Sequence, residues 1–348
     1  MDLNFFKNKK IFITGHSGFK GSWLCKVLLY LGADIYGYAL KDGLTPSLFE
    51  MLDIHKHVNS FYGDIRDFDR LLKIYKNIRP ELVIHLAAQP IVRESYIRPR
   101  YTYETNVMGT VNILECIRNT SYTRSFLNVT TDKVYENKEW IWGYRENEKL
   151  DGFDPYSNSK SCSELVTHSY KNSFFSGREV AISTARAGNV IGGGDFSPDR
   201  IVPDCVRAAE QGIQVLVRNP NSVRPYQHVL DPLYAYLLIL STQYSDTRYS
   251  GYYNVGPNED NCIATSSLVD MFCKAWGNMT WRKAADSYSG HEANILKLDS
   301  SLMKSTFGWN PKWDMQTAIE KTVEWERSRI SSEDISSITN SQIRAFLI

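Results

Sequence analysis

The sequence predicts an α/β fold with a doubly wound parallel sheet and a smaller, interleaved lobe toward its carboxyl end. Two observations lead to this prediction. In the first half of the chain, short apolar runs alternate with segments of helical length, which is the pattern of βαβ units. After Arg186, closely spaced glycines, prolines and shorter apolar runs replace this pattern, as expected for a second lobe.

The first βαβ unit is expected at the beginning of the chain, with a strand at 10–14, a helix from about 19 to 31 that ends at Gly32, and a strand at 34–40. Strands joined by helices in this way run parallel. The alternation continues with helices near 67–77, 104–118 and 155–170 and with strands at 82–86, 125–129 and 180–185.

The chain is expected to cross between the two lobes more than once. Residues 1–186 are predicted to form the first lobe. The segment 228–256 is expected to rejoin it, because it reads as a helix at 228–240 followed by a strand at 252–255. The smaller lobe then consists of residues 187–227 and 257–348.

Composition limits the classes of partner. Forty Lys plus Arg against 39 Asp plus Glu give a net charge of +1, so no overall field attracts nucleic acid or an anionic membrane. The longest apolar run, 233–240, is far shorter than the roughly 20 residues that span a bilayer, and the lysine-rich start leads into a strand rather than a signal segment. We therefore expect a cytoplasmic protein. The six cysteines form no Cys-x-x-Cys pair, so we expect reduced thiols and no metal.

A glycine-rich turn follows the first predicted strand. Gly15, Gly18 and Gly21 would allow a sharp turn, close approach of a pyrophosphate and close packing of helix against sheet. This spacing resembles the turn of short-chain dehydrogenase/reductase enzymes, especially the extended branch that acts on nucleotide sugars. The resemblance implies a Rossmann-type lobe that binds NAD.

Three details of the cofactor site stay open. His16 could donate to a phosphate or crowd the dinucleotide. Asp42 after the second strand suits NAD and Lys41 suits a 2′-phosphate, with NAD favoured by the resemblance. Asp64 matches the adenine-contacting segment of that family, or it caps a helix. The resemblance implies cofactor contacts from Gly15, His16, Gly18, Phe19, Lys20, Gly21, Asp64, Ile65, Leu86, Ala87, Ala88, Asn106, Tyr156 and Lys160.

Tyr156 and Lys160 lie four residues apart and share one face of a predicted helix. A phenol with a pKa of ~10 is a poor base at neutral pH, but a neighbouring ammonium and an oxidised nicotinamide both favour the phenolate. Tyr-x-x-x-Lys alone is a weak signal. After a glycine turn at this distance it predicts a catalytic pair.

Thr131, Asp132 and Lys133 follow a predicted strand, at the sheet edge where doubly wound folds bind ligands. In short-chain enzymes a Ser or Thr at this position bonds the substrate and the catalytic tyrosine, and Thr131 matches it. Nucleotide-sugar 4,6-dehydratases usually continue with Asp and Glu. Lys133 in place of the Glu resembles the CDP-glucose 4,6-dehydratase family, and similar segments extend over nearly the whole chain. A solvated turn with two opposite charges is the plainer alternative.

That resemblance also implies how a sugar nucleotide is held. Arg218 and Arg224 are candidates for its pyrophosphate, because guanidinium groups pair with phosphate oxygens. Trp140 and Trp142 could form a flap near the sugar or pack in the core. The substrate contacts we expect are Gln89, Arg93, Asn189, Arg200, Arg218, Arg224, His228 and His291, although Asn189 could simply cap a loop and His228 a helix.

The implied reaction is conversion of CDP-glucose to CDP-4-keto-6-deoxyglucose, with NAD regenerated in each turnover and a homodimer as the expected assembly. Tyr156 would take the C4 hydroxyl proton, Asp132 would protonate the departing C6 hydroxyl, and Lys133 would act at C5 as base or as electrostatic stabiliser. Two alternatives remain: a nucleotide-sugar 4-epimerase, which needs no acid to expel water, and a catalytically silent dinucleotide-binding sensor.

Overall fold

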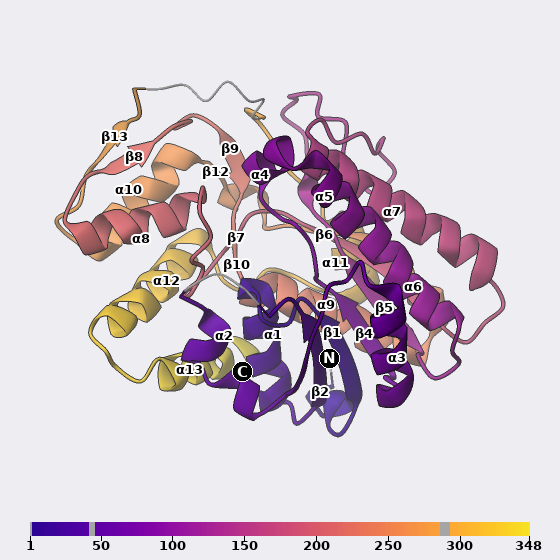
Figure 1. Ribbon diagram of the computed structural model, residues 1–348. Helices are drawn as coiled ribbons and strands as arrows, with labels where there is room; N and C mark the ends of the chain where they lie inside the picture. Colours follow the sequence, from indigo (N-terminus) through magenta and orange to yellow (C-terminus); the bar gives the residue numbers. More distant parts are fainter. Residues whose placement is uncertain (1, 42–45, 286–292) are drawn as a thin grey trace.

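A computed structural model of the chain describes residues 2–41, 46–285 and 293–348 (Figure 1). Its centre is a seven-stranded sheet in the order β11-β6-β5-β4-β1-β2-β3 with every pair parallel, so the expected doubly wound α/β fold is confirmed. The strands are β1 (Lys10–Thr14), β2 (Asp34–Ala39), β3 (Asn59–Tyr62), β4 (Leu82–His85), β5 (Ser125–Val129), β6 (Ala181–Ala187) and β11 (Tyr252–Val255).

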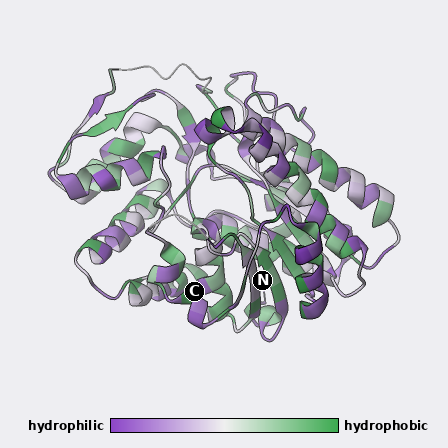
Figure 2. Ribbon diagram, viewed as in Figure 1, coloured by the Kyte–Doolittle hydropathy of each residue, from purple (hydrophilic) through white to green (hydrophobic). Residues whose placement is uncertain are grey.

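Helices cover both faces of the sheet. One face packs against α1 (Phe19–Tyr30), α9 (Leu230–Ser245) and α13 (Ile335–Leu347), which share a buried cluster that includes Trp23, Leu233 and Phe346. The other face packs against α3 (Phe68–Ile78), α6 (Gly109–Arg118) and α7 (Pro155–Phe174). Figure 2 shows apolar residues concentrated in the strands and polar residues on the outward-facing sides of the helices.

The second lobe is built from short strands and helices around its own core. Helices α8 (Ile201–Gln211), α10 (Thr265–Trp276) and α12 (Met315–Ile330) pack together around Cys205, Phe272 and Ile319. The strands form three two-stranded sheets: β7 (Val190–Ile191) with β10 (Gln227–His228), β9 (Val223–Pro225) with β12 (Cys262–Ala264), and β8 (Val215–Val217) with β13 (Trp281–Lys283).

Two expected helices differ from those observed. Instead of one helix over 104–118, the chain forms α4 (Val92–Ile97), α5 (Pro99–Tyr103), a π-helical turn (Glu104–Met108) and then α6. The apolar pattern runs smoothly through this segment, so it does not reveal the wider turn. The helix expected to begin at 228 begins instead at Leu230, because Gln227–His228 pair with β7 as a strand.

The remaining helices are α2 (Leu48–Met51) and α11 (Ser301–Phe307). Within the described ranges, no helix has the length and apolar character needed to cross a membrane. In the same ranges no three His, Cys, Asp or Glu side chains gather in a way that could hold a metal ion. All six cysteines are free thiols, and four of them are buried.

Candidate functional site

A cleft of about 330 Å³ lies where the carboxyl ends of the strands meet the second lobe. Both lobes contribute to its walls. The sheet side supplies residues that follow β5 and begin α7, and the second lobe supplies a set of arginines. Of the expected catalytic and substrate residues, the cleft is lined by Thr131, Asp132, Lys133, Tyr156, Arg93, Asn189, Arg200, Arg218 and Arg224.

The glycine turn has the geometry that a dinucleotide phosphate requires. Gly15 has φ +74°, and a Cβ there would lie 2.8 Å from the Ala87 nitrogen, so a side chain would be both strained and blocked. A Cβ on Gly21 would lie 2.2 Å from the Gly15 oxygen. Gly18 is the N-cap of α1 and provides no side-chain cap. The first amides of α1 therefore remain available to an anion.

His16 lies in this turn, but its ring points into the protein. The ring is fully buried, packs edge-on against Phe49 and lies directly over Gly37 of β2, where an added Cβ would come within 2.2 Å of it. Its Nε2 is 3.0 Å from the Ser60 hydroxyl, and burial lowers the pKa of His16 to about 4. The imidazole therefore forms part of the floor beneath the turn and is neutral at physiological pH.

The other expected cofactor residues lie around the same edge of the sheet. Asp64 does not cap α3, which is capped by Asp67. Its carboxylate instead pairs with the Arg66 guanidinium, 2.6 Å away, and this contact lowers the pKa of Asp64. Ile65 is buried. Leu86, Ala87 and Ala88 follow β4 and are only partly buried. Asp42 lies outside the described residues.

Asn106 belongs to the π-helical turn, and its buried side chain bonds other residues of the protein. Its side-chain oxygen accepts from the Gln89 amide at 2.8 Å, and its nitrogen donates to the Gln89 carbonyl and to the Ser159 hydroxyl. This contact fixes α7 against the loop that follows β4. π-turns of this kind are frequent at functional sites, and here the turn directs an amide between two elements that line the cofactor edge.

Tyr156 and Lys160 stand on α7 as the spacing predicts. The helix begins in the Asp154-Pro155 step, where the Asp154 carboxylate accepts from the Ser157 amide and proline occupies the first turn. Tyr156 lines the cleft, and burial raises the pKa of its phenol to about 12, partly offset by Thr131. Lys160 lies behind it and donates to the Val129 carbonyl at 3.2 Å. Burial lowers the pKa of Lys160 to about 8.

Asp132 and Lys133 form a 3₁₀ turn directly after β5, capped by Thr131. The Thr131 hydroxyl donates to Asp132 Oδ1 at 3.0 Å, while Oδ2 is buried and accepts no hydrogen bond from the described residues. Burial raises the pKa of Asp132, which favours the protonated acid. A buried carboxyl with one oxygen free beside the cleft is suited to donate a proton to a bound hydroxyl.

Lys20 is a cleft residue that the sequence placed only in the phosphate turn. It lines the same cleft as Asp132 and Tyr156. Burial lowers the pKa of Lys20 to about 8, and Arg200 and Lys160 add to this shift. Its ammonium makes no hydrogen bond or ion pair with residues of the described ranges. Lys20 lies between Gly18 and Gly21 in the sequence. Its place in the turn does not indicate that its side chain reaches the cleft, which only the fold shows.

The arginines of the opposite wall are held by carboxylates or by carbonyl groups. Arg93 and Arg218, from different lobes, both donate to Asp199 Oδ1 at 2.8 Å. Arg200 pairs with Asp195 at 2.8 Å. Arg224 donates to the Val223 carbonyl at 2.9 Å and to those of Ala293 and Asn294. The two aspartates were not foreseen, because their role depends on arginines far away in the sequence.

Two expected substrate residues do not face the cleft. The Gln89 side chain is buried and bonds Ile91 and Thr102, so its polar atoms already have partners. His228 does not line the cleft: its ring is fully buried next to Trp23 and Trp313. Its Nδ1 accepts from the Leu230 amide at 3.3 Å, which agrees with the alternative of a cap at the start of the following helix. His291 lies outside the described residues.

The two tryptophans suggested as a flap also lie away from the cleft. Trp140 stacks on Tyr144, with ring centroids 5.3 Å apart. Trp142 is 67% exposed. Both line a separate surface hollow with Lys297 and Asp299. Packing, rather than a cover over the sugar, is therefore the role that the structure gives to Trp140.

Comparisons with known proteins agree with this geometry. The family model described as GDP-mannose 4,6 dehydratase matches residues 12–322. The chain is 44% identical to the CDP-glucose 4,6-dehydratase of Salmonella typhimurium, over 96% of this chain and 95% of that protein.

Solved structures with the same fold include two enzymes bound to NAD. A UDP-glucose 4-epimerase from Thermus thermophilus aligns with a TM-score of 0.79 at 25% identity, covering 91% of this chain and 99% of that one. A dTDP-glucose 4,6-dehydratase from Bacillus anthracis aligns with a TM-score of 0.77 at 22% identity, covering 93% and 98%.

Proposed function

Since the chain belongs to the GDP-mannose 4,6 dehydratase family, we propose that this enzyme converts CDP-glucose to CDP-4-keto-6-deoxyglucose and water. The observation that carries the proposal is that an oxidation set, Thr131 and Tyr156, and an elimination pair, Asp132 and Lys133, line one cleft. The choice of nucleotide rests on the Salmonella typhimurium relative.

NAD is the cofactor, and the residues around the glycine turn fit it. The uncapped amides at the start of α1 would hold its pyrophosphate. We expect Asp64 and the loop after β4 to contact the adenosine half and Lys160 to contact the nicotinamide ribose. The cofactor would supply the hydride acceptor for C4 and the hydride donor for C6, and its cationic ring would favour the Tyr156 phenolate.

Tyr156 performs the first proton transfer. Its phenol oxygen takes the proton of the C4 hydroxyl, while the Thr131 hydroxyl holds the substrate oxygen in line. In the protein alone the phenol is protonated at neutral pH, since burial raises its pKa to about 12. The charged Lys160 side chain, one helical turn away, favours the phenolate.

Asp132 and Lys133 perform the elimination. The new C4 ketone acidifies the C5 proton. Lys133 either removes this proton as a base or stabilises the negative charge of the enolate that forms when the proton leaves. Asp132 protonates the departing C6 hydroxyl, and burial, which raises the pKa of this carboxyl, favours its acid form. This order makes Asp132 and Lys133 dispensable for oxidation at C4 and necessary for loss of water.

The second lobe would hold the substrate diphosphate. Arg218 and Arg224 both line the cleft, and guanidinium groups form paired, charge-assisted bonds with phosphate oxygens. Asn189, which follows β6 and also lines the cleft, would contact the same part of the ligand. Arg200 and Arg93 extend the positive wall.

The test is to incubate the protein with NAD and, separately, with CDP-, UDP-, GDP- and dTDP-glucose, and to follow the product masses. We expect loss of one water from CDP-glucose. A product of unchanged mass but altered C4 configuration would indicate a 4-epimerase. Binding of NAD without conversion of any of the four sugars would indicate a dinucleotide-binding sensor.

We also propose that the enzyme is a cytoplasmic homodimer. Six free thiols fit a reducing compartment. Helices α6 and α7 lie side by side on the outside of the first lobe (Figure 1). Met108, at the end of the π-helical turn before α6, is 48% exposed, and Leu165 of α7 is 54% exposed. Pairing of two copies through these helices would cover both side chains. Sedimentation of wild type and Leu165→Glu tests this, with a dimer expected only for wild type.

A further inference from the structure

A buried carboxylate lies one helical turn beyond Lys160. Tyr156, Lys160 and Glu164 are spaced four apart on α7, so they share the helix face that packs on the sheet. All three are buried, and Glu164 is only 1% exposed. A fully buried carboxylate is costly unless it is paired and hydrogen-bonded. Its contacts therefore require an explanation.

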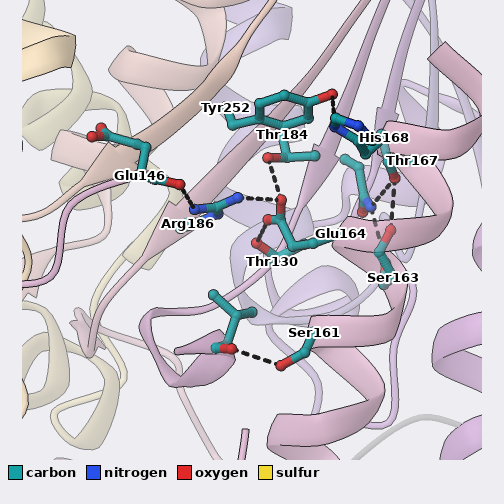
Figure 3. A network of polar contacts seen from close by, with 12 residues as sticks. Thr130, Glu146, Ser161, Ser163, Glu164, Thr167, His168, Thr184, Arg186 and Tyr252 are labelled. Carbon is teal, nitrogen blue, oxygen red and sulfur yellow. Dashed lines mark hydrogen bonds and ion pairs between the residues drawn. The ribbon is translucent and has the colours of Figure 1, made fainter. Parts of the chain in front are cut away.

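Glu164 is the centre of a polar network drawn in Figure 3. Its Oε1 accepts from the Thr130 hydroxyl. Its Oε2 accepts from Thr184 at 2.7 Å and from Arg186 Nη2 at 2.9 Å. The carboxylate thus joins α7 to the residue that follows β5 and to two residues of β6. We call Glu164, Thr130, Thr184 and Arg186 the Glu164 network.

Arg186 extends this network to the segment that follows Lys133. Its Nη1 donates to the Tyr135 hydroxyl at 2.8 Å and to the Glu146 carbonyl at 2.9 Å. The Tyr135 hydroxyl donates in turn to Asn254 of β11 at 2.7 Å. The guanidinium therefore holds the segment after Lys133 in place. Of the residues in this chain of contacts, Thr130 and Tyr135 line the cleft.

The electrostatic neighbours of Lys160 give Glu164 a second role. Among the described residues the ammonium donates to one partner, the Val129 carbonyl, and burial opposes its charge. Its charge acts on His85 of β4 and on Lys20 of α1, and Tyr156 lies one turn before it on the same helix. His85 is neutral and Lys20 is a like charge. Glu164 is the neighbour that favours the ammonium.

We propose that Glu164 is a positioning residue for the reaction proposed above: its carboxylate keeps the Lys160 side chain charged and ties α7 to the strand end that carries Thr131. Arg186 pairs with this carboxylate at 2.9 Å and holds it between α7 and β6. The Glu164 carboxylate is thus a fixed negative charge one helical turn beyond Lys160 and two turns beyond Tyr156. The inference rests on the proposed dehydratase reaction only for its kinetic test.

The kinetic test is the pH profile of kcat/KM for CDP-glucose in Glu164→Gln. Activity falls at high pH when Lys160 loses its proton. Without the carboxylate this alkaline limb is expected to move to lower pH by about one unit or more. Near pH 6, where Lys160 is still charged, kcat should approach that of wild type within about threefold, and KM should change little.

Two further variants keep the test decisive. Glu164→Gln leaves Arg186 as an unpaired buried charge and can fail to fold, so Glu164→Gln/Arg186→Met, which removes both charges, is measured beside it. A shift of the alkaline limb in the same direction, but smaller, is expected, because loss of the Arg186 charge opposes part of the effect. Thr184→Val is the matched control, because it removes one hydrogen bond to the same carboxylate and no charge. Its alkaline limb should stay where wild type has it.

A readout independent of turnover is the titration of Lys160 itself. It can be followed by NMR in protein with isotope-labelled lysine, with the Lys160 signal assigned by its absence from Lys160→Met. We expect Lys160 to lose its proton at lower pH in both charge-removing variants. If its titration and the alkaline limb are unchanged, and turnover falls equally at every pH, Glu164 is only structural. If wild type fails to dehydrate CDP-glucose, the function is wrong while this titration still tests Glu164.

Discussion

The catalytic side chains on the sheet wall of the cleft and the arginines on the opposite wall are held by different kinds of contact. Thr131, Asp132 and Tyr156 are each less than 10% exposed. Thr131 and Asp132 stand at the capped 3₁₀ turn that follows β5, and Tyr156 stands in the capped first turn of α7. Arg93 and Arg218 are 33% exposed and share one carboxylate, that of Asp199.

This difference separates chemistry from binding. Groups aimed at a developing charge are most effective when they do not have to reorganise during the reaction. Exposed ion pairs, in contrast, contribute only about 0–1 kcal/mol, so a phosphate can replace Asp199 beside its arginines at little cost. The sheet wall is therefore built for fixed geometry, whereas the pair Arg93 and Arg218 on the opposite wall is suited to the exchange of one anion for another. Arg224 on that wall is 3% exposed and bonded to carbonyl groups, so it resembles the sheet wall in this respect.

The largest effect is expected on the sheet wall, from Tyr156→Phe. The ring keeps its packing but the base is lost, so turnover should fall by about 10²- to 10⁴-fold, while NAD affinity measured by calorimetry stays close to that of wild type. Normal turnover in this variant would place the base on another residue and would end the distinction between the two walls.

Asp132→Asn and Lys133→Met should separate the two halves of the reaction. Neither residue is needed to oxidise C4, so with CDP-glucose both variants should accumulate NADH in stopped-flow absorbance, while product formation slows by about 10²-fold. Exchange of the C5 proton with deuterated solvent should fall in Lys133→Met if the lysine is the base. Failure of both variants to reduce NAD, with substrate still bound, would remove them from the elimination step.

The sheet wall should also be sensitive to acid in a way that the arginine wall is not. Burial holds the pKa of His85 at about 3, against an ordinary value of 6.5, and Lys160 adds to this shift. Between these values the unfolded chain binds a proton that the folded protein excludes, so the free energy of unfolding falls as pH decreases, by up to about 1.4 kcal/mol per pH unit for this group. Guanidinium groups stay charged throughout this range.

Urea unfolding of wild type and His85→Asn between pH 7.5 and 4 measures this contribution. The variant is expected to be less stable at neutral pH, because His85 bonds Thr14 at 2.7 Å, but to show a flatter decrease toward acid. Parallel curves for the two proteins would mean that His85 is already protonated in the folded state.

The smallest effect is expected from Asp199→Asn. Removing the carboxylate that competes for Arg93 and Arg218 should lower KM for CDP-glucose by about two- to threefold and leave kcat unchanged. Arg218→Met, measured beside it, should raise KM by about tenfold, since it removes a phosphate partner. A large loss of kcat in Asp199→Asn would show that this wall also requires fixed geometry.

Much of the fold follows from local signals in the sequence. The glycine turn, the spacing of apolar runs and the Asp154-Pro155 start of α7 each depend on neighbours within a few residues, and all were identified correctly. The π-helical turn at Glu104–Met108 was not. It leaves the apolar pattern almost unchanged, and the Asn106 side chain within it bonds Gln89 and Ser159, which lie far from it in the sequence.

The site was harder to predict where partners come from distant segments. Thr131, Asp132, Lys133 and Tyr156 do line one cleft. His228, in contrast, has the residue type of a ligand contact but is enclosed by Trp23 and Trp313, which lie more than 80 positions away on either side in the sequence. Burial by such remote neighbours leaves no local signal.

The way β11 completes the sheet has a consequence for how the protein is made. Until residues 252–255 leave the ribosome, β6 is an edge strand with unpaired backbone groups. Until residues 230–245 follow it, the apolar face that α9 covers is open as well. The nascent chain must therefore carry an unfinished Rossmann sheet through the synthesis of the 68 residues from 188 to 255, and an exposed edge strand and apolar face of this kind favour association with chaperones.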